Sequence, residues 1–204
     1  MESNPFRRAR FMLSAHDLPD LPPEGGAEVA FAGRSNAGKS SALNALADHN
    51  RLAFVSKTPG RTQLINFFDL GDGRKLVDLP GYGYAAVPAA IKAHWQGVLA
   101  AYVGQRASLC GVVLIMDARH PLKPLDVQLI GWLAPTGRAL HCLLTKADKL
   151  TRADQNAALS GVRRELKKLH PGATAQLFSS TAKTGREEAV SMIAAMMDRH
   201  PQKT

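Results

Sequence analysis

Cysteine, long apolar runs and acidic residues are all scarce in this chain of 204 residues. The two cysteines, Cys110 and Cys142, lie in separate apolar segments, so we expect neither a disulfide scaffold nor a zinc site, and a reducing cytoplasm suits the chain. The longest apolar run, 109–116, is too short for a membrane-spanning helix, which needs roughly 18 residues. The N-terminal sequence MESNPFRRAR is followed by no apolar stretch of a secretory signal. Only 17 acidic residues face 26 lysines and arginines, and the net charge of +9 suggests a polyanionic partner.

Short apolar runs alternate with longer helical patterns along most of the chain. The pattern predicts strands over 28–32, 64–70, 75–79, 109–117, 140–145 and 173–179, and helices over 39–48, 88–103, 124–133, 152–169 and 186–199. Two of these strands are apolar on consecutive residues, which is typical of strands covered on both faces in a mostly parallel sheet. We therefore expect one doubly wound α/β domain over 28–200, after an extended N-terminal lead-in over 1–27 and before a C-terminal tail over 201–204.

Residues 33–40 carry a phosphate-binding motif. They read Gly-Arg-Ser-Asn-Ala-Gly-Lys-Ser, which fits GxxxxGK[ST], and they join the first predicted strand to the first predicted helix. Glycines let backbone N–H groups converge on phosphate oxygens, and the start of a helix adds partial positive charge. Lys39 would bring a full charge to the β and γ phosphates, and the Ser40 hydroxyl could ligate Mg²⁺. A chance glycine-rich helix start is the alternative, and the loop alone does not distinguish ATP from GTP.

A second motif, Asp-Leu-Pro-Gly, begins at Asp78 at the end of the third predicted strand. Ligands bind at this carboxyl edge of an open α/β sheet, so Asp78 could hold Mg²⁺ through water and the N–H of Gly81 could meet the γ phosphate. Between the two motifs lies a polar, loop-like segment in which Thr62 is the better candidate to complete the Mg²⁺ shell and Thr58 the second. A plain surface turn is the alternative interpretation of that segment.

A Thr-Lys-Ala-Asp sequence at 145–148 ends another predicted strand and could recognise a base. The Asp148 carboxylate can accept two N–H bonds from the guanine edge, which adenine does not offer, at about 1.5–3 kcal/mol each. Lys146 would lay its aliphatic stem along the purine face, and backbone N–H groups over 178–183 could bond the guanine carbonyl. The alternative is an ordinary helix start with Asp148 or Thr151 as its N-cap. It is weakened because two phosphate motifs precede this one in order.

With these segments in place, the chain resembles the TRAFAC-class small GTPases and, more narrowly, the EngB (YihA/YsxC-type) ribosome-biogenesis GTP-binding proteins of bacteria. The narrow match lies in 28–41, 57–63, 65–68, 78–85, 145–149 and 178–180, within a resemblance that spans roughly 5–200. Its most specific parts are the Thr-Pro-Gly-Arg-Thr-Gln and Tyr-Gly-Tyr sequences. The resemblance implies a P-loop NTPase fold of the Ras-like GTPase type, with a mostly parallel central sheet flanked by helices on both faces.

The resemblance also implies bound GTP or GDP with Mg²⁺, a role in assembling the large ribosomal subunit with its rRNA and proteins, and a link to cell division and septation. Carried over by position, the nucleotide contacts are Gly33, Arg34, Ser35, Asn36, Ala37, Gly38, Lys39, Ser40, Ser41, Gly60, Arg61, Thr62, Gln63, Leu64, Asp78, Leu79, Pro80, Gly81, Thr145, Lys146, Ala147, Asp148, Phe178, Ser179 and Ser180. Ser40 and Thr62 would ligate Mg²⁺, beside Asp78. Thr145 stands where most GTPases have Asn, an EngB-like departure that puts one auxiliary contact in doubt.

Slow intrinsic hydrolysis is expected because Tyr82 stands where Ras-like GTPases place the Gln that orients the attacking water. A phenol held away from the phosphate cannot orient water as an amide does. Asn36 resembles the Asn of cation-dependent GTPases, which helps to hold K⁺ against the phosphates; alternatively, it only braces the loop. The expected catalytic residues are Lys39, Thr62, Asp78, Gly81 and Asn36.

Two basic clusters could contact the phosphate backbone of RNA: Arg7, Arg8 and Arg10, and the helical set Arg163, Arg164, Lys167 and Lys168. A merely solvated helix face is the plainer interpretation of the second cluster. The histidines show no ligand-like spacing and are expected to be structural. We expect a monomer without membrane insertion.

Three functions remain open. They are a GTP-driven switch on an assembling ribosome particle, a P-loop kinase that moves a γ phosphate to a small acceptor, and a nucleotide-binding module without turnover. The motif at 145–148 favours the first, because a kinase would not need a guanine-reading carboxylate there.

Overall fold

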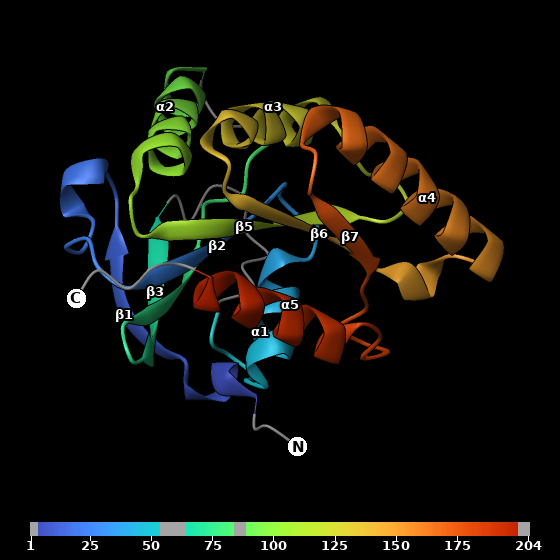
Figure 1. Ribbon diagram of the computed structural model, residues 1–204, viewed down its shortest axis with the longest axis horizontal. Helices are drawn as coiled ribbons and strands as arrows, with labels where there is room; N and C mark the ends of the chain where they lie inside the picture. Colours follow the sequence, from blue (N-terminus) through green and yellow to red (C-terminus); the bar gives the residue numbers. More distant parts are fainter. Residues whose placement is uncertain (1–3, 54–63, 84–88, 200–204) are drawn as a thin grey trace.

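A seven-stranded sheet lies at the centre of the computed structural model, which describes residues 4–53, 64–83 and 89–199. The helices α2 (Ala89–Gln105), α3 (Pro124–Leu133) and α4 (Arg152–Leu169) cover one face, and α1 (Lys39–Ala47) and α5 (Arg186–Asp198) cover the other (Figure 1). Helices on both faces of a sheet bury its central strands. This arrangement confirms the predicted α/β fold.

The strand order is β1-β3-β4-β2-β5-β6-β7. The strands are β1 (Arg10–Ala15), β2 (Ala27–Gly33), β3 (Ile65–Gly71), β4 (Arg74–Asp78), β5 (Leu109–Asp117), β6 (Ala139–Thr145) and β7 (Thr174–Leu177). Strands β4, β2, β5, β6 and β7 run parallel, whereas β3 is antiparallel to both β1 and β4. The carboxyl ends of the parallel strands meet at one edge, so the loops that follow them gather there.

The central strands are buried on both faces, as their unbroken apolar sequences predict. Every residue of β2 is buried, and β5 is buried from Gly111 to Met116. On the side of α2, α3 and α4 the core includes Tyr102 and Leu129, and on the side of α1 and α5 it includes Leu43. All predicted strands and helices are present, with some ends shifted by one or two residues.

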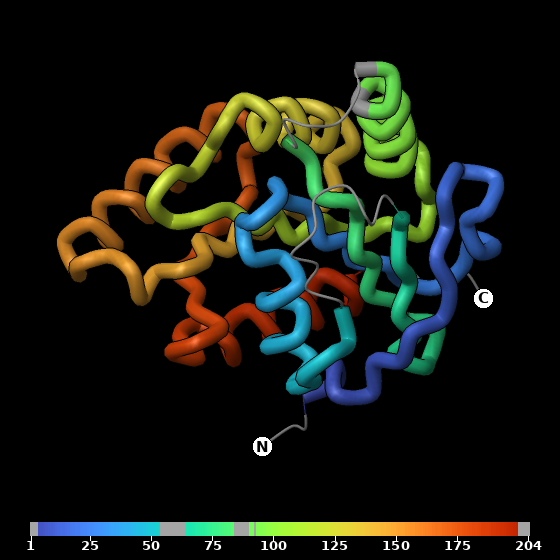
Figure 2. The backbone as a smooth tube through the Cα atoms, turned by 180° about the vertical axis from the view of Figure 1, so that it is seen from behind, coloured from blue at the N-terminus to red at the C-terminus, as the bar shows by residue number. Residues whose placement is uncertain are grey.

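The N-terminal lead-in contributes a strand that the apolar pattern does not predict. β1 pairs antiparallel with β3 and forms the edge of the sheet opposite to β7 (Figure 2). Before it, a short 3-10 helix, η1 (Pro5–Arg8), buries Phe6, and the Asn4 side chain donates to the carbonyl oxygen of Leu46 at 2.7 Å. The start of the described chain is therefore fastened to the domain.

Among the described residues, no helix combines the length and the apolar character needed to cross a membrane.

Candidate nucleotide-binding site

The phosphate motif forms a tight loop between β2 and α1. Gly38 precedes α1 with a φ of +95°, a left-handed conformation that glycine adopts without strain. The amide groups of Gly38, Lys39, Ser40 and Ser41 donate no hydrogen bond to any residue that the structure describes. Unpaired N–H groups at the start of a helix are the feature that binds phosphate oxygens.

The first glycine of the motif serves the packing of the sheet. Gly33 does not adopt a positive φ, and a Cβ at this position would lie 2.6 Å from the carbonyl oxygen of Ile115 in β5. No side chain fits there unless the strands move. The expected role of glycine in converging N–H groups therefore applies to Gly38, whereas Gly33 permits the close approach of β2 and β5.

Lys39 and Asp78 come together from separate motifs. The Lys39 ammonium, in the first turn of α1, forms an ion pair with Asp78 Oδ1 at the end of β4. Only 11% of each side chain is exposed, so each charge is largely removed from water and the pairing offsets that loss. The structure thus brings the phosphate-motif lysine and the proposed magnesium carboxylate to one point, as the sequence predicts.

The segment after Asp78 is joined to the phosphate loop through its backbone. Ser35 N donates to the carbonyl oxygen of Tyr82 at 2.9 Å, and Tyr82 N donates to the carbonyl oxygen of Gly33 at 3.3 Å. The Tyr82 hydroxyl donates to Asp126 Oδ1 in α3 at 2.8 Å. Burial, with the Asp126 carboxylate beside it, raises the pKa of Tyr82 well above its usual value. The phenol is thus neutral and its proton is engaged on α3.

Thr145 ties the end of β6 to the phosphate loop. Its Oγ1, in a residue only 3% exposed, lies within hydrogen-bond distance of the carbonyl oxygens of Ala37 and Met116, which share its one proton. The replacement of Asn by Thr put one auxiliary contact in doubt. A side-chain link from this position to the loop is present after all, made by the hydroxyl.

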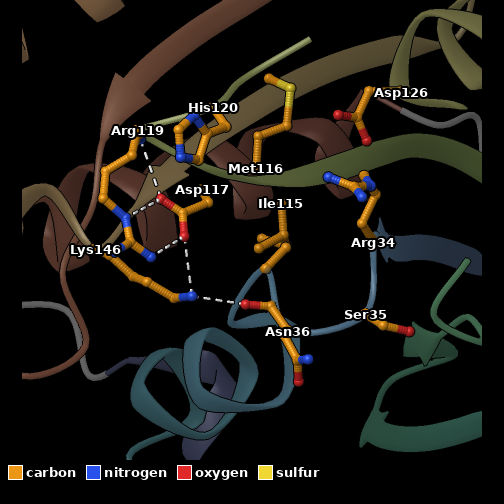
Figure 3. Close-up of a pocket in the computed structure, with 11 residues that line it drawn as sticks. Arg34, Ser35, Asn36, Ile115, Met116, Asp117, Arg119, His120, Asp126 and Lys146 are labelled. Carbon is orange, nitrogen blue, oxygen red and sulfur yellow. Dashed lines mark hydrogen bonds and ion pairs between the residues drawn. The ribbon is translucent and has the colours of Figure 1, made fainter. Parts of the chain in front are cut away.

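Lys146 makes the adjacent link. Its Nζ donates to the carbonyl oxygen of Asn36 at 2.7 Å and lies 3.0 Å from Asp117 Oδ2 (Figure 3). Arg119 donates to both oxygens of Asp117, at 2.9 and 2.6 Å, and these hydrogen bonds, followed by that of Lys146, hold the pKa of Asp117 well below its usual range. Asp117 is therefore ionised and fixes the end of the lysine chain.

The base motif meets the loop after β7. The Ser179 hydroxyl donates to Asp148 Oδ1 at 2.6 Å, and Ala147 N donates to the carbonyl oxygen of Phe178 at 3.2 Å. The bond from Ser179 lowers the pKa of Asp148, so its exposed carboxylate is ionised and can accept N–H groups. Thr151 is the N-cap of α4 and accepts from Asp154 N, so Asp148 does not cap that helix. The helix start of the alternative interpretation is therefore present with Thr151 as its cap, which leaves the Asp148 carboxylate without a capping role.

A pocket opens beside the phosphate loop, between it and β5 (Figure 3). Its charged lining includes Arg34, Asp117, Arg119 and Asp126, and of these the sequence assigned only Arg34 to the site. An Asp at the end of a buried strand was the signal that could have identified Asp117. Asn36 also lines the pocket, and its side-chain amide makes no hydrogen bond to a described residue.

Thr58, Gly60, Arg61, Thr62 and Gln63 fall outside the described residues, and Leu64 is the first residue after that gap.

One basic cluster differs from the expectation. The Arg163 guanidinium donates to the carbonyl oxygen of Ala175 in β7, at 2.8 and 3.1 Å, so it supports the sheet and does not belong to a free basic face. Lys168 and Arg164 flank Glu165 instead, at 3.0 and 3.7 Å.

Residues 28–146 match the family described as 50S ribosome-binding GTPase. A protein of Methylobacillus flagellatus named "Probable GTP-binding protein EngB" is 61% identical over 188 residues, which cover 92% of this chain and 91% of that protein. The crystal structure of a probable GTP-binding protein engB has a TM-score of 0.68 at 20% identity, covering 84% of this chain and 99% of that one. Era, in complex with MgGDPNP and nucleotides of 16S ribosomal RNA, has a TM-score of 0.64 at 18% identity, covering 89% of this chain and 59% of that one. Both structures share the fold. The chain belongs to the 50S ribosome-binding GTPases and, among them, to the EngB family of GTP-binding proteins.

Proposed function

We propose that this protein binds GTP with Mg²⁺, hydrolyses it slowly to GDP and phosphate, and acts as a nucleotide-dependent switch in the assembly of the large ribosomal subunit. One observation carries the nucleotide part of the proposal. Lys39, Asp78 and Asp148 come from distant segments and belong to one edge of the sheet, where Thr145 and Lys146 link the base motif to the phosphate loop.

The phosphates would lie on the unpaired amides at the start of α1, with the Lys39 ammonium beside the β and γ groups. The Ser40 hydroxyl and the Asp78 carboxylate are hard oxygen donors of the kind that Mg²⁺ prefers, so this pair fits the ion, with Thr62 proposed as a further ligand. Bound Mg²⁺ would neutralise charge that develops on the phosphates. Lys39 and Asp78 are paired with each other in the structure. On nucleotide binding, Lys39 would turn to the phosphates and Asp78 to the Mg²⁺ shell.

The guanine would lie against Lys146, with its N1 and exocyclic amine donating to Asp148. The Ser179 hydroxyl supports this role because it occupies Oδ1 and orients the carboxylate. The Gly81 amide would donate a hydrogen bond to the γ phosphate. When hydrolysis removes that phosphate, the loss of this bond would be transmitted to the phosphate loop by Tyr82, whose backbone is hydrogen-bonded to Gly33 and Ser35.

Competition among GTP, ATP and XTP tests the base assignment. Asp148→Asn is expected to lower the affinity for GTP by roughly 10²-fold or more, because a charged acceptor of hydrogen bonds is lost. The same variant should gain affinity for XTP. Asp72→Asn is the matched control, since Asp72 lies in the exposed turn between β3 and β4. Equal competition by ATP and GTP in the unaltered protein would contradict the assignment and favour a kinase.

Hydrolysis is expected to be slow because the Tyr82 hydroxyl is engaged by Asp126. We also propose that Asn36 helps to hold K⁺ against the phosphates. Its amide makes no bond to another described residue, which supports this role over a bracing one. Single-turnover hydrolysis should be faster in KCl than in NaCl, and Asn36→Ala should abolish the difference. Equal rates of the unaltered protein in both salts would remove the K⁺ proposal.

The ribosomal partner is supported by the net charge of +9 and by the exposed side chains of Arg164 and Lys168 on α4. The protein would act in the cytoplasm as a monomer and, by family resemblance, be needed for normal cell division and septation. Co-sedimentation with ribosomal subunits should be stronger with a non-hydrolysable GTP analogue than with GDP. Equal co-sedimentation with GDP and with the GTP analogue would contradict the proposed switch.

A further inference from the structure

A cluster of two histidines and one aspartate joins the N-terminal segment to α2 and includes none of the predicted nucleotide contacts. His16 follows β1 directly, Asp17 is the N-cap of the short 3-10 helix η2 (Leu18–Asp20), and His94 lies in α2. Because His16 and His94 are far apart in the chain, their spacing gives no sign of this cluster. The expectation that every histidine is structural therefore does not extend to these two.

The geometry of the cluster is that of a bridged pair of imidazoles. Asp17 Oδ2 lies 2.9 Å from His16 Nδ1, and Asp17 Oδ1 lies 2.9 Å from His94 Nε2. One ligand atom from each residue lies within 4.8 Å of the other two. The two imidazole rings stack with centroids 5.9 Å apart, and the Trp95 ring packs edge-on against both.

The surroundings hold these side chains in place while leaving their polar atoms accessible. Trp95 is only 7% exposed, so it provides a rigid wall from the core. By contrast, 57% of His16, 44% of His94 and 42% of Asp17 is exposed, and an ion can reach them from solvent.

We propose that His16, Asp17 and His94 form a binding site for a zinc-class divalent transition metal ion. Two imidazole nitrogens and one carboxylate oxygen are a donor set that Zn²⁺ takes in proteins, with the fourth position left to water. Ligand atoms about 2.0–2.2 Å from a tetrahedral ion stand roughly 3.3–3.6 Å apart. Side-chain rotations would have to bring the three ligand atoms, which lie within 4.8 Å of one another, to this separation. A bound ion would replace the bridging protons and fasten the end of β1 to α2.

Isothermal titration calorimetry, in which ZnCl₂ is added to the full chain in the presence of GDP and excess Mg²⁺, tests the site without relying on GTPase activity. Mg²⁺ and GDP saturate the phosphate site, so its oxygens do not report zinc. The unaltered protein should bind one Zn²⁺ per chain, and its Tm should rise on adding zinc and fall back with a chelator. His16→Gln and His94→Gln should each lose the saturable binding and the Tm shift. When Co²⁺ is added in place of Zn²⁺, the unaltered protein should show intense visible absorption bands, and both variants should lack them.

His49→Gln is the matched control, because His49 is exposed in the turn after α1 and its backbone N–H, not its ring, donates to the carbonyl oxygen of Asn44. It should bind zinc and shift in Tm as the unaltered protein does. Unfolding curves without zinc check that the His16 and His94 variants are folded. The proposal is overturned if the unaltered protein binds no zinc saturably, if either variant still binds it, or if His49→Gln loses it equally. Because no nucleotide contact is involved, this outcome is independent of the proposed GTPase function.

Discussion

Replacing Thr145 by Val tests whether the hydroxyl at the end of β6 positions the phosphate loop. Val has nearly the same shape but no donor, so the carbonyl oxygens of Ala37 and Met116 lose the hydroxyl that they share. A buried acceptor left without its donor costs about 1–3 kcal/mol. We expect the free energy of unfolding to fall by that amount, since Thr145 is only 3% exposed.

The effect on the nucleotide separates this role from simple packing. Each loss of about 1.4 kcal/mol in the preorganisation of the loop weakens binding tenfold. Because Lys146 provides a second tie to the loop, we expect GDP affinity to fall about tenfold and not to vanish. Thr145→Ser keeps the hydroxyl and removes a methyl group, which lowers stability by about 0.8 kcal/mol but leaves the tie in place.

Urea unfolding followed by circular dichroism gives the stability, and titration with a fluorescent GDP analogue gives the affinity. Thr145→Val should lower both the stability and the GDP affinity, whereas Thr145→Ser should lower the stability alone. Unchanged GDP affinity in Thr145→Val, or equal weakening in both variants, would refute the positioning role.

Three further changes probe the packing and the ion pairs of the domain. Gly33→Ala places a Cβ 2.6 Å from a carbonyl oxygen of β5 and should lower the free energy of unfolding by about 1–3 kcal/mol, whereas Gly97→Ala, at an exposed helical glycine with open space around it, should raise stability by about 0.5–1 kcal/mol; thermal unfolding compares them. The lowered pKa of Asp117 means that its ionised form adds stability above the ordinary carboxyl pKa of about 3.9, and that this is lost as pH falls below it. The stability gap between the unaltered protein and Asp117→Asn should therefore be full at neutral pH and shrink on acidification, and a constant gap would contradict the ion-pair account. Arg106→Leu removes the closer of the two cations beside the fully buried Glu28 carboxylate, leaving only Lys75 Nζ at 3.9 Å, and should cost about 3–5 kcal/mol in urea unfolding. Adding Glu28→Gln should restore most of this, because the amide still accepts from a neighbouring hydroxyl, and a double variant as unstable as the single one would count against it.

Those parts of the fold that depend on local burial were predictable from the sequence. Strand β5 and helices α3 and α4 begin and end where the apolar pattern predicts, because strands covered on both faces and helices with one apolar face leave a periodic record. The phosphate and base motifs could be placed for the same reason, since each follows such a strand.

Strand β1 left no such record. Phe11 is 61% exposed and Met12 is 45% exposed, so the strand shows no alternation of buried and exposed side chains. Backbone hydrogen bonds pair it with β3 and are independent of side-chain type, and its side chains add an edge contact of Phe11 with Phe68 and a hydrogen bond from Ser14 to Asn66. A pattern of hydropathy cannot report pairing of that kind.

Contacts between distant residues were equally hidden. The hydroxyl of Thr145 reaches a carbonyl 108 positions earlier, and Arg163 directs its guanidinium to the backbone of β7 instead of to solvent. Both residues were identified from the sequence. However, the contact of Thr145 was left in doubt, and Arg163 was placed in an exposed basic cluster. Only the folded arrangement determines which partner a long polar side chain finds.

Under the proposed function, the ties made by Thr145 and Lys146 would place the base and the γ phosphate at different parts of the loop. Thr145 and Lys146 are consecutive, and they bond the consecutive carbonyls of Ala37 and Asn36, so the base motif is fixed to this side of the loop by a set register. Tyr82, the residue after the Asp-Leu-Pro-Gly segment, accepts instead from Ser35 N, one position earlier in the loop than Asn36. A γ phosphate at that segment would therefore leave the position of Asp148 unchanged. It follows that Asp148→Asn should weaken GTP and GDP by the same factor, measured by titration of both nucleotides in one buffer, whereas unequal factors would mean that the two sides of the loop move together.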